Sequence, residues 1–71
     1  MSKHPRTLRT ELRLRRALED FGGWMTTQEL RIAGGGSYPR TIETLNDLWA
    51  DDRVEKARLG AGAGLSWRWK R

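Results

Sequence analysis

The residues of this 71-residue chain that could do chemistry are mainly cations. Its 14 Lys and Arg residues outnumber 9 Asp and Glu residues, giving a formal net charge of +5 and a pI near 10.8. Residues 1–16 and residues 53–71 each hold six cations and one acid, whereas residues 17–52 hold two cations and seven acids. A cationic surface favours polyanions such as nucleic acid. We therefore expect the two ends of the chain to hold such a partner, unless their charges serve only solubility.

Catalytic and metal-binding chemistry finds little support in the sequence. The chain has no cysteine and a single histidine, His4, so neither a Cys-based zinc site nor a Ser/His/Asp or Cys/His arrangement can be assembled. The run Gly34-Gly35-Gly36-Ser37 precedes an expected helix but lacks the lysine of a phosphate-cradling loop. We expect no enzyme activity, no cofactor and no metal.

The length of the chain suits one small domain, which we expect to span residues 1–71. No apolar run approaches the roughly 18 to 20 residues that are needed to cross a bilayer. The opening MSKHPRTLR has basic residues without an apolar stretch after them, so we expect no secretory signal. These observations predict a protein of the cytoplasm with no membrane segment.

The first of four pieces separated by glycines has the pattern of an amphipathic helix. We expect residues 1–5 to be flexible and residues 6–21 to form a helix that the glycines at 22–23 end. One face is apolar and consists of Leu14, Ala17, Leu18 and Phe21, extended at the first turns by Leu8 and Leu12. The opposite face carries Arg9, Arg13 and Arg16, which either bind phosphate or are only solvated.

The second and third pieces have the start signals of two more helices. Thr26 and Glu29 have the spacing of a capping box, which predicts a short helix over residues 27–33 that the glycines at 34–36 end. Ser37 offers an N-cap for a longer helix over residues 38–51, with Pro39 in its first turn. The buried stripe of this helix is predicted to contain Tyr38, Ile42, Leu45 and Trp49, with Thr41 and Leu48 at its edge. The opposite face is predicted to contain Arg40, Glu43, Thr44 and Asp47.

The last piece, residues 53–71, has the pattern of a β-hairpin. Two extended stretches, 53–59 and 65–71, flank a glycine-rich loop at 60–64. Leu65, Trp67 and Trp69 alternate with polar residues, which predicts one apolar and one basic face. Val54 is out of phase with the later residues of its stretch, so we expect a β-bulge there or packing of Val54 before the strand begins.

The order of these elements resembles the winged-helix branch of the helix-turn-helix superfamily. The resemblance lies in TTQELRIAGGGSYPRTIETLNDLWADDRVEKARLGAGAGLSWRWKR, in which a capped helix, a glycine turn, a longer helix and a basic hairpin follow one another. It implies an α+β fold with a three-helix helix-turn-helix core and a C-terminal two-stranded hairpin, the wing. The motif carries order and spacing and no catalytic signature.

The resemblance also implies where DNA would bind. The helix over residues 38–51 would enter the major groove, and Arg40 would make a bidentate contact to guanine. Hydroxyls and backbone amides at the helix starts would touch phosphates, and the wing cations would lie along the backbone. The implied DNA-binding residues are Thr27, Gln28, Ser37, Tyr38, Arg40, Thr41, Thr44, Arg58, Arg68, Lys70 and Arg71.

Acidic residues on the third helix depart from this pattern and leave two functions open. The first is a sequence-preferring double-stranded DNA-binding protein, a transcription regulator or an architectural factor of the phage or mobile-element type. It would be a monomer in solution that could associate on DNA, where it would join the nucleoid. The second is a winged-helix protein-protein interaction module that uses the face formed by Glu43, Asp47 and Asp51.

Overall fold

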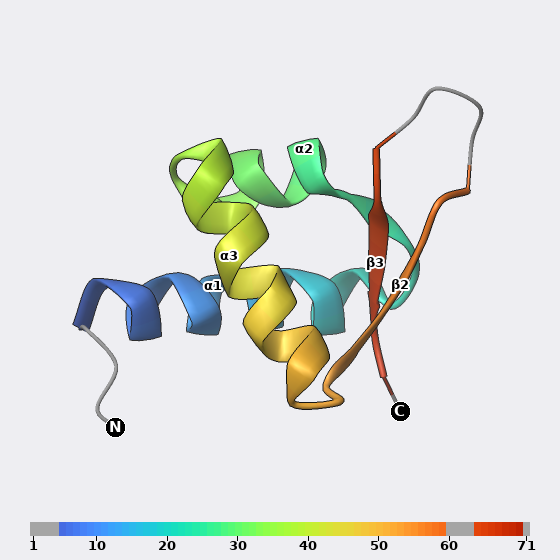
Figure 1. The fold of residues 1–71 in the computed structure, drawn as a ribbon, viewed down its shortest axis with the longest axis horizontal. Coiled ribbons are helices and arrows are strands. Elements are labelled where there is room, and N and C mark those ends of the chain that lie inside the picture. The colour runs from blue at the N-terminus through green and yellow to red at the C-terminus, as the bar shows by residue number, and fades with distance from the viewer. Residues whose placement is uncertain (1–4, 60–63, 71) are drawn as a thin grey trace.

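The computed structural model describes residues 5–59 and 64–70, without the side chains of residues 5–8 and 35. The described part is an α+β fold, in which helices pack against one face of a three-stranded antiparallel sheet (Figure 1). The elements in chain order are α1 (Pro5–Phe21), β1 (Met25–Thr26), α2 (Thr27–Leu30), the π-helical turn η1 (Arg31–Gly35), α3 (Tyr38–Ala50), β2 (Val54–Ala57) and β3 (Ser66–Trp69).

Local signals in the sequence set the helix ends. Gly22, at φ 74°, ends α1, and its N–H donates to the carbonyl of Leu18 at 3.1 Å. The capping box is confirmed, because the Glu29 N–H donates to Thr26 Oγ1 at 3.1 Å and the Thr26 N–H donates to Glu29 Oε1 at 2.8 Å. Ser37 caps α3 by accepting from the Arg40 N–H at 3.3 Å.

The second helix differs from the prediction of one helix over residues 27–33. The α-helical part has only four residues, and η1 continues it to Gly35. Gly34 lies against α1, because a Cβ atom added to it would lie 2.9 Å from the Cβ of Arg13. This close approach of η1 to α1 requires glycine and brings the turn before α3 onto the first helix.

The sheet has one strand more than the predicted two-stranded wing. The strand order is β1-β3-β2, with Met25 opposite Trp67 and Thr26 opposite Ser66. The two residues of β1 give little sequence signal, and β3 supplies the edge with which they pair. The prediction of a wing with two strands is therefore incomplete, although the antiparallel pair β2 and β3 is present.

The ladder between β2 and β3 does not contain the expected β-bulge at Val54. Val54 lies opposite Trp69 and Lys56 lies opposite Trp67 in a continuous ladder. Val54 is buried inside the strand, so the phase of β2 is set by Val54 and Lys56. Lys56 fits on this apolar face because its ammonium lies 3.9 Å from the ring centroid of Trp49 and 5.8 Å from that of Trp67.

The core lies between the sheet and the three helices. Its buried apolar residues are Leu14, Leu18, Met25, Leu30, Leu45, Leu48, Val54 and Trp67. Phe21 and Leu12, which were predicted to face inward, are exposed on α1. Leu8 lies outside the described side chains. Fewer apolar residues of α1 therefore join the core than the apolar pattern of this helix predicts.

The buried stripe of α3 is rotated from the predicted one. Tyr38 and Trp49 are about half exposed, at 45% and 47%, while Thr41 and Thr44 are buried. Burial of the two threonines leaves no polar atom without a partner, because Thr41 Oγ1 donates to the Ser37 carbonyl and Thr44 Oγ1 donates to the Arg40 carbonyl, both at 2.8 Å. The prediction that Tyr38 and Trp49 lie in the buried stripe is therefore wrong.

One threonine joins the helical core to the wing. Thr27 Oγ1 accepts a hydrogen bond from Trp67 Nε1 at 2.8 Å and donates one to the carbonyl of Leu65 at 3.0 Å. The backbone N–H of Thr27 donates to the same carbonyl at 3.2 Å. Both Thr27 and Trp67 are buried, so the start of α2 and strand β3 are held in one register without water.

Thr27→Val should destabilise the protein by about 1–3 kcal/mol, because it leaves the indole N–H of Trp67 buried without an acceptor. Thr27→Ser is the matched control, since it keeps the hydroxyl and loses only a methyl group. The measurement is urea unfolding followed by tryptophan fluorescence. Equal stability of Thr27→Val and the parent protein would show that the hydrogen bond has no net role.

Candidate nucleic-acid interface

Six of the predicted DNA-binding residues are exposed, and one of them, Lys70, is paired with Asp52. Ser37, Tyr38 and Arg40 are exposed at the start of α3, Gln28 is exposed on α2, and Arg58 is exposed just after β2. Arg40 forms no ion pair within the described part of the chain, so its guanidinium is available to a ligand. These residues stay candidates for contact with a nucleic acid.

The side chains of three predicted DNA-binding residues are buried and cannot make the predicted contacts with DNA. Thr27, Thr41 and Thr44 are at most 4% exposed. Their hydroxyls are used inside the protein, on Leu65 and Trp67 for Thr27 and on backbone carbonyls of α3 for the others. A buried hydroxyl that already bonds within the chain cannot reach a phosphate on the surface. Arg71, another of the predicted DNA-binding residues, lies outside the described residues.

Both predicted cations of β3 and its end are paired with acids. Arg68 donates from Nε and Nη2 to Glu55 Oε1 at 3.0 and 2.8 Å, and its guanidinium lies 4.6 Å from the ring centroid of Trp24. Lys70 Nζ lies 2.6 Å from Asp52 Oδ1. These carboxylates offset much of the charge that the wing strands would offer to phosphate. Contact of Arg68 and Lys70 with DNA stays a prediction.

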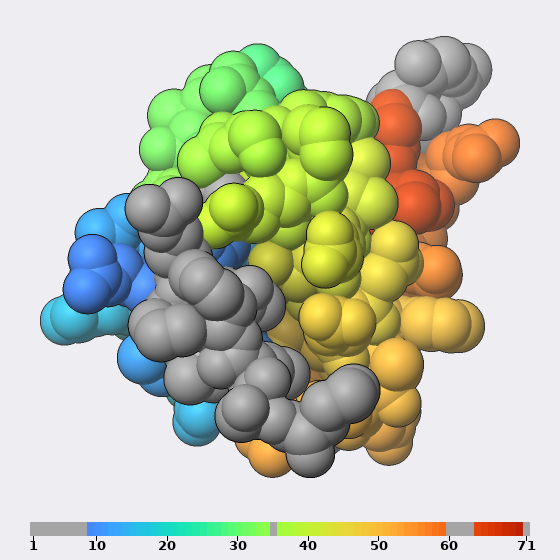
Figure 2. Space-filling view, turned by 60° about the vertical axis from the view of Figure 1, so that its left-hand side comes forward, coloured from blue at the N-terminus to red at the C-terminus, as the bar shows by residue number. Residues whose placement is uncertain are grey.

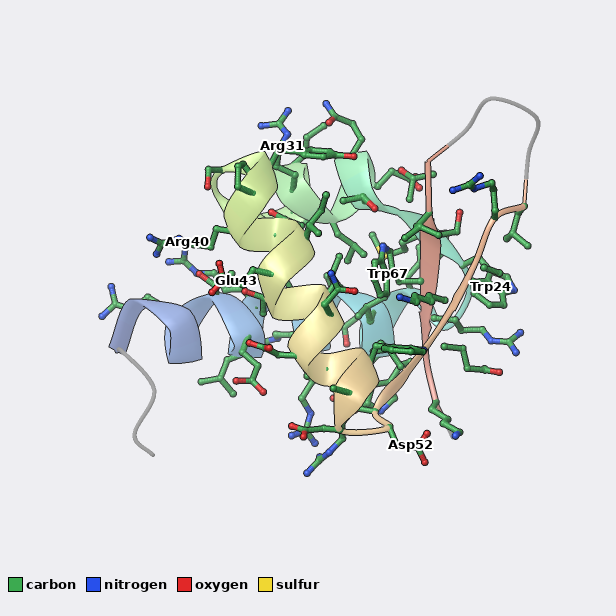
Figure 3. All side chains as sticks on the ribbon, viewed as in Figure 1. Trp24, Arg31, Arg40, Glu43, Asp52 and Trp67 are labelled. Atoms are coloured by element: carbon green, nitrogen blue, oxygen red, sulfur yellow. The ribbon has the colours of Figure 1, made fainter. Side chains whose placement is uncertain are left out.

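The charge of α3 changes sign along its length. The first turn has the Ser37 cap, Arg40 and the positive end of the helix dipole. Beyond Arg40, the exposed charged side chains are all acidic: Glu43 and Asp47 on the helix, then Asp51 and Asp52 at its end. Figure 3 shows Arg40 and Glu43 on the side of α3 away from the hairpin. A polyanion is therefore attracted only to the beginning of α3.

Cations without a carboxylate partner lie mainly outside the wing strands. Among the described residues they are Arg9, Arg13, Arg16, Arg31, Arg40, Arg53, Arg58 and Lys56, the last of which lies over Trp49. Arg31 and Arg53 were absent from the predicted site, and nothing in their spacing distinguishes them. The arginine stripe of α1 was visible as a pattern, but the sequence does not show which basic residues form ion pairs.

Comparison of the chain with protein-family models, curated proteins and solved structures finds no match. The part of the chain that the structure describes contains no helix long and apolar enough to span a membrane. The argument for function therefore depends on the surface charges and on the geometry of α3 and its neighbours.

The Lys70–Asp52 pair makes a measurable electrostatic prediction. The hydrogen bond and the charge of Asp52 raise the pKa of Lys70 above its ordinary value of 10.5. A raised lysine pKa means that the pair stabilises the fold below pH 10.5 and that this contribution is lost as the pH rises through the pKa of Lys70. Asp52→Asn should return that pKa toward its ordinary value.

The measurement is an NMR titration of the Lys70 side chain between pH 8 and about 12 in the parent protein and in the variant. Asn is the suitable replacement because residue 52 has φ 62°, a region that Asn tolerates as Asp does. An unchanged Lys70 titration in Asp52→Asn would mean that the pair does not persist in solution.

Proposed function

We propose that this chain is a sequence-preferring double-stranded DNA-binding protein of the winged-helix type, acting as a transcription regulator or an architectural factor. The observation that carries the proposal is the exposed beginning of α3, where the Ser37 cap and Arg40 face outward on a helix that an antiparallel hairpin follows in the chain. A capped helix start with an outward arginine suits the major groove, where guanidinium groups read guanine O6 and N7.

The charge pattern of α3 favours entry of the helix by its first turns. Arg40 would read a base, while Ser37 and Tyr38 would contact phosphate from the same end of the helix. Gln28 on α2 and Arg58 beside the wing would hold the DNA backbone on either side. The acidic end of α3, which starts with Glu43, would stay outside the groove because phosphate repels it.

The size of the protein limits the length of the site that it can read. A single module of this type covers a short DNA site, so useful affinity needs neighbouring copies on the duplex. We propose a monomer in solution that associates with further copies on DNA. It would act in the cytoplasm and belong to the nucleoid when bound.

Replacing Arg40 by Ala should relax the preference at one base pair by about 1–3 kcal/mol, because the variant loses a bidentate contact to guanine. The measurement starts from a site selected out of random duplexes with the parent protein. Binding of both proteins is then compared on that site and on its single-base variants. Arg53→Ala is the control, since Arg53 is an exposed arginine at the other end of α3. An identical base preference for Arg40→Ala and the parent would exclude this role.

A second candidate function is a protein-interaction module. It is favoured by the acidic face of α3, because Glu43, Asp47 and Asp51 are exposed and none forms an ion pair within the described residues. Such a surface suits a basic protein partner.

The triple variant Glu43→Gln, Asp47→Asn and Asp51→Asn separates the two candidates. DNA affinity should hold or rise if α3 binds DNA, because three repulsive charges are removed. DNA affinity is measured by fluorescence anisotropy with a labelled mixed-sequence duplex at two salt concentrations. A parent protein that binds no duplex at low salt would exclude the first candidate and leave the second.

A further inference from the structure

We propose that Arg9, Arg13 and Arg16 on α1 form a phosphate-binding surface that holds the backbone of duplex DNA beside the start of α3. The proposal rests on the proposed function and adds a second contact region to it, on the side of α3 opposite the wing. In this proposal α1, and not the wing, makes the main contact with the DNA backbone. The resemblance to winged helices assigns that contact to the wing strands.

The first argument is the distribution of paired and unpaired cations. Arg68 and Lys70 are held by carboxylates, and Arg15 on α1 is held by Glu19 at 2.7 Å. Arg9, Arg13 and Arg16 are all exposed, and none of them has a carboxylate partner in the described part of the chain. An unpaired guanidinium can bind phosphate without first giving up an ion pair.

The second argument is the direction in which the three side chains lie on α1. Thr10, Leu14 and Leu18 define the buried face of this helix. Arg9, Arg13 and Arg16 follow at spacings of four and three residues, so they share one flank of α1 outside that face. From Arg9 to Arg16 the flank is about 10 Å long, at 1.5 Å per residue, which is about the rise of three base pairs.

The third argument is the connection of this flank to α3. A Cβ atom added to Gly34 would lie 2.9 Å from the Cβ of Arg13, so the flank borders η1 directly. η1 leads to the Ser37 cap within two residues. Figure 2 shows the described part of α1, the η1 region and the beginning of α3 on one face of the molecule. A phosphate backbone that runs along α1 therefore reaches the end of α3 that attracts it.

Neighbouring charges set the limits of this surface. Arg40 on α3 extends it, and Figure 3 shows Arg40 on the side of α3 that is away from Trp24 and the hairpin. Asp20, one turn after Arg16, ends the cationic flank on α1. Glu43 and Asp47 end it on α3.

The test compares two triple variants with the same net charge. The first is Arg9→Gln, Arg13→Gln and Arg16→Gln, which removes the unpaired cations of the flank. Gln keeps Cβ, Cγ and Cδ, so the packing of residue 13 on Gly34 is preserved, and it is a good helix former. The control is Arg15→Gln, Arg53→Gln and Lys56→Gln, which removes three cations that lie outside the proposed DNA contacts. Circular dichroism and thermal unfolding establish that both variants are folded.

The readout is the dependence of duplex affinity on salt concentration. Each phosphate contact contributes about 0.9 to the slope of log K against log salt, so loss of three contacts should lower the slope by about 2 to 3. The flank variant should show this loss and bind a mixed-sequence duplex at least about tenfold more weakly at low salt. The control should retain most of the slope. Amide shifts of residues 9–16 on titration with DNA should accompany the effect.

The outcomes separate this proposal from the proposed function. If the flank variant keeps the parent's slope while Arg40→Ala still changes the base preference, the flank proposal is wrong and the proposed function stands. If both triple variants lose the same slope, the effect is one of net charge and the flank proposal is also wrong. A parent protein that binds no duplex at low salt overturns the proposed function, and the flank proposal with it.

Discussion

The hydrogen bond between Thr27 and Trp67 is the interaction on which the relation between helices and wing depends. Trp67 is the largest fully buried side chain among the described residues, and its indole nitrogen needs an acceptor inside the core. Thr27 supplies it from the first residue of α2 and also binds the carbonyl of Leu65. The direction of the wing relative to α3 depends on this arrangement, because β2 pairs with β3 and follows the turn after α3.

Aromatic side chains and carboxylates together organise the cations of this small protein. Each cation of the sheet lies over an aromatic ring or on an acid: Lys56 over Trp49, Arg68 between Glu55 and Trp24, and Lys70 on Asp52. Such contacts order the wing, and they also reduce its attraction for anions. The distribution of charge along the chain is therefore a poor guide to the distribution of available charge on the surface.

Much of the fold could be predicted because its signals are local. The helix starts at Thr26 and Ser37 depend on side-chain hydrogen bonds to amides three residues away, which the sequence displays directly. The alternation of apolar and polar residues in the sequence indicates β3, although the strand does not alternate in burial, because Ser66 is buried beside Trp67. Strand β1 was not predicted, because two residues have no periodicity and pair only when β3 offers an edge. The buried face of α3 was predicted wrongly because threonine hydroxyls can donate to carbonyls of their own helix. Thr41 and Thr44 are therefore buried at little cost in free energy.

The candidate site was harder to predict than the fold, since it depends on which charges meet in space. Arg40 and Arg58 are exposed, as expected, but the pairing of Arg68 with Glu55 depends on the strand register and that of Lys70 with Asp52 on the left-handed turn before β2. No pattern in the sequence fixes either of these. A basic residue in a small domain can therefore be assigned to a ligand only after its neighbours are known.

The central position of β3 has a consequence for how the protein is made. Both β1 and β2 pair only with β3, which is the last of the three to leave the ribosome. The bond from Trp67 to Thr27 spans 40 residues, so the start of α2 has no partner for its hydroxyl while the intervening segments are translated. The helices can form early from local contacts, but the sheet and the core it covers close in a late step after residues 66–69 have been synthesised.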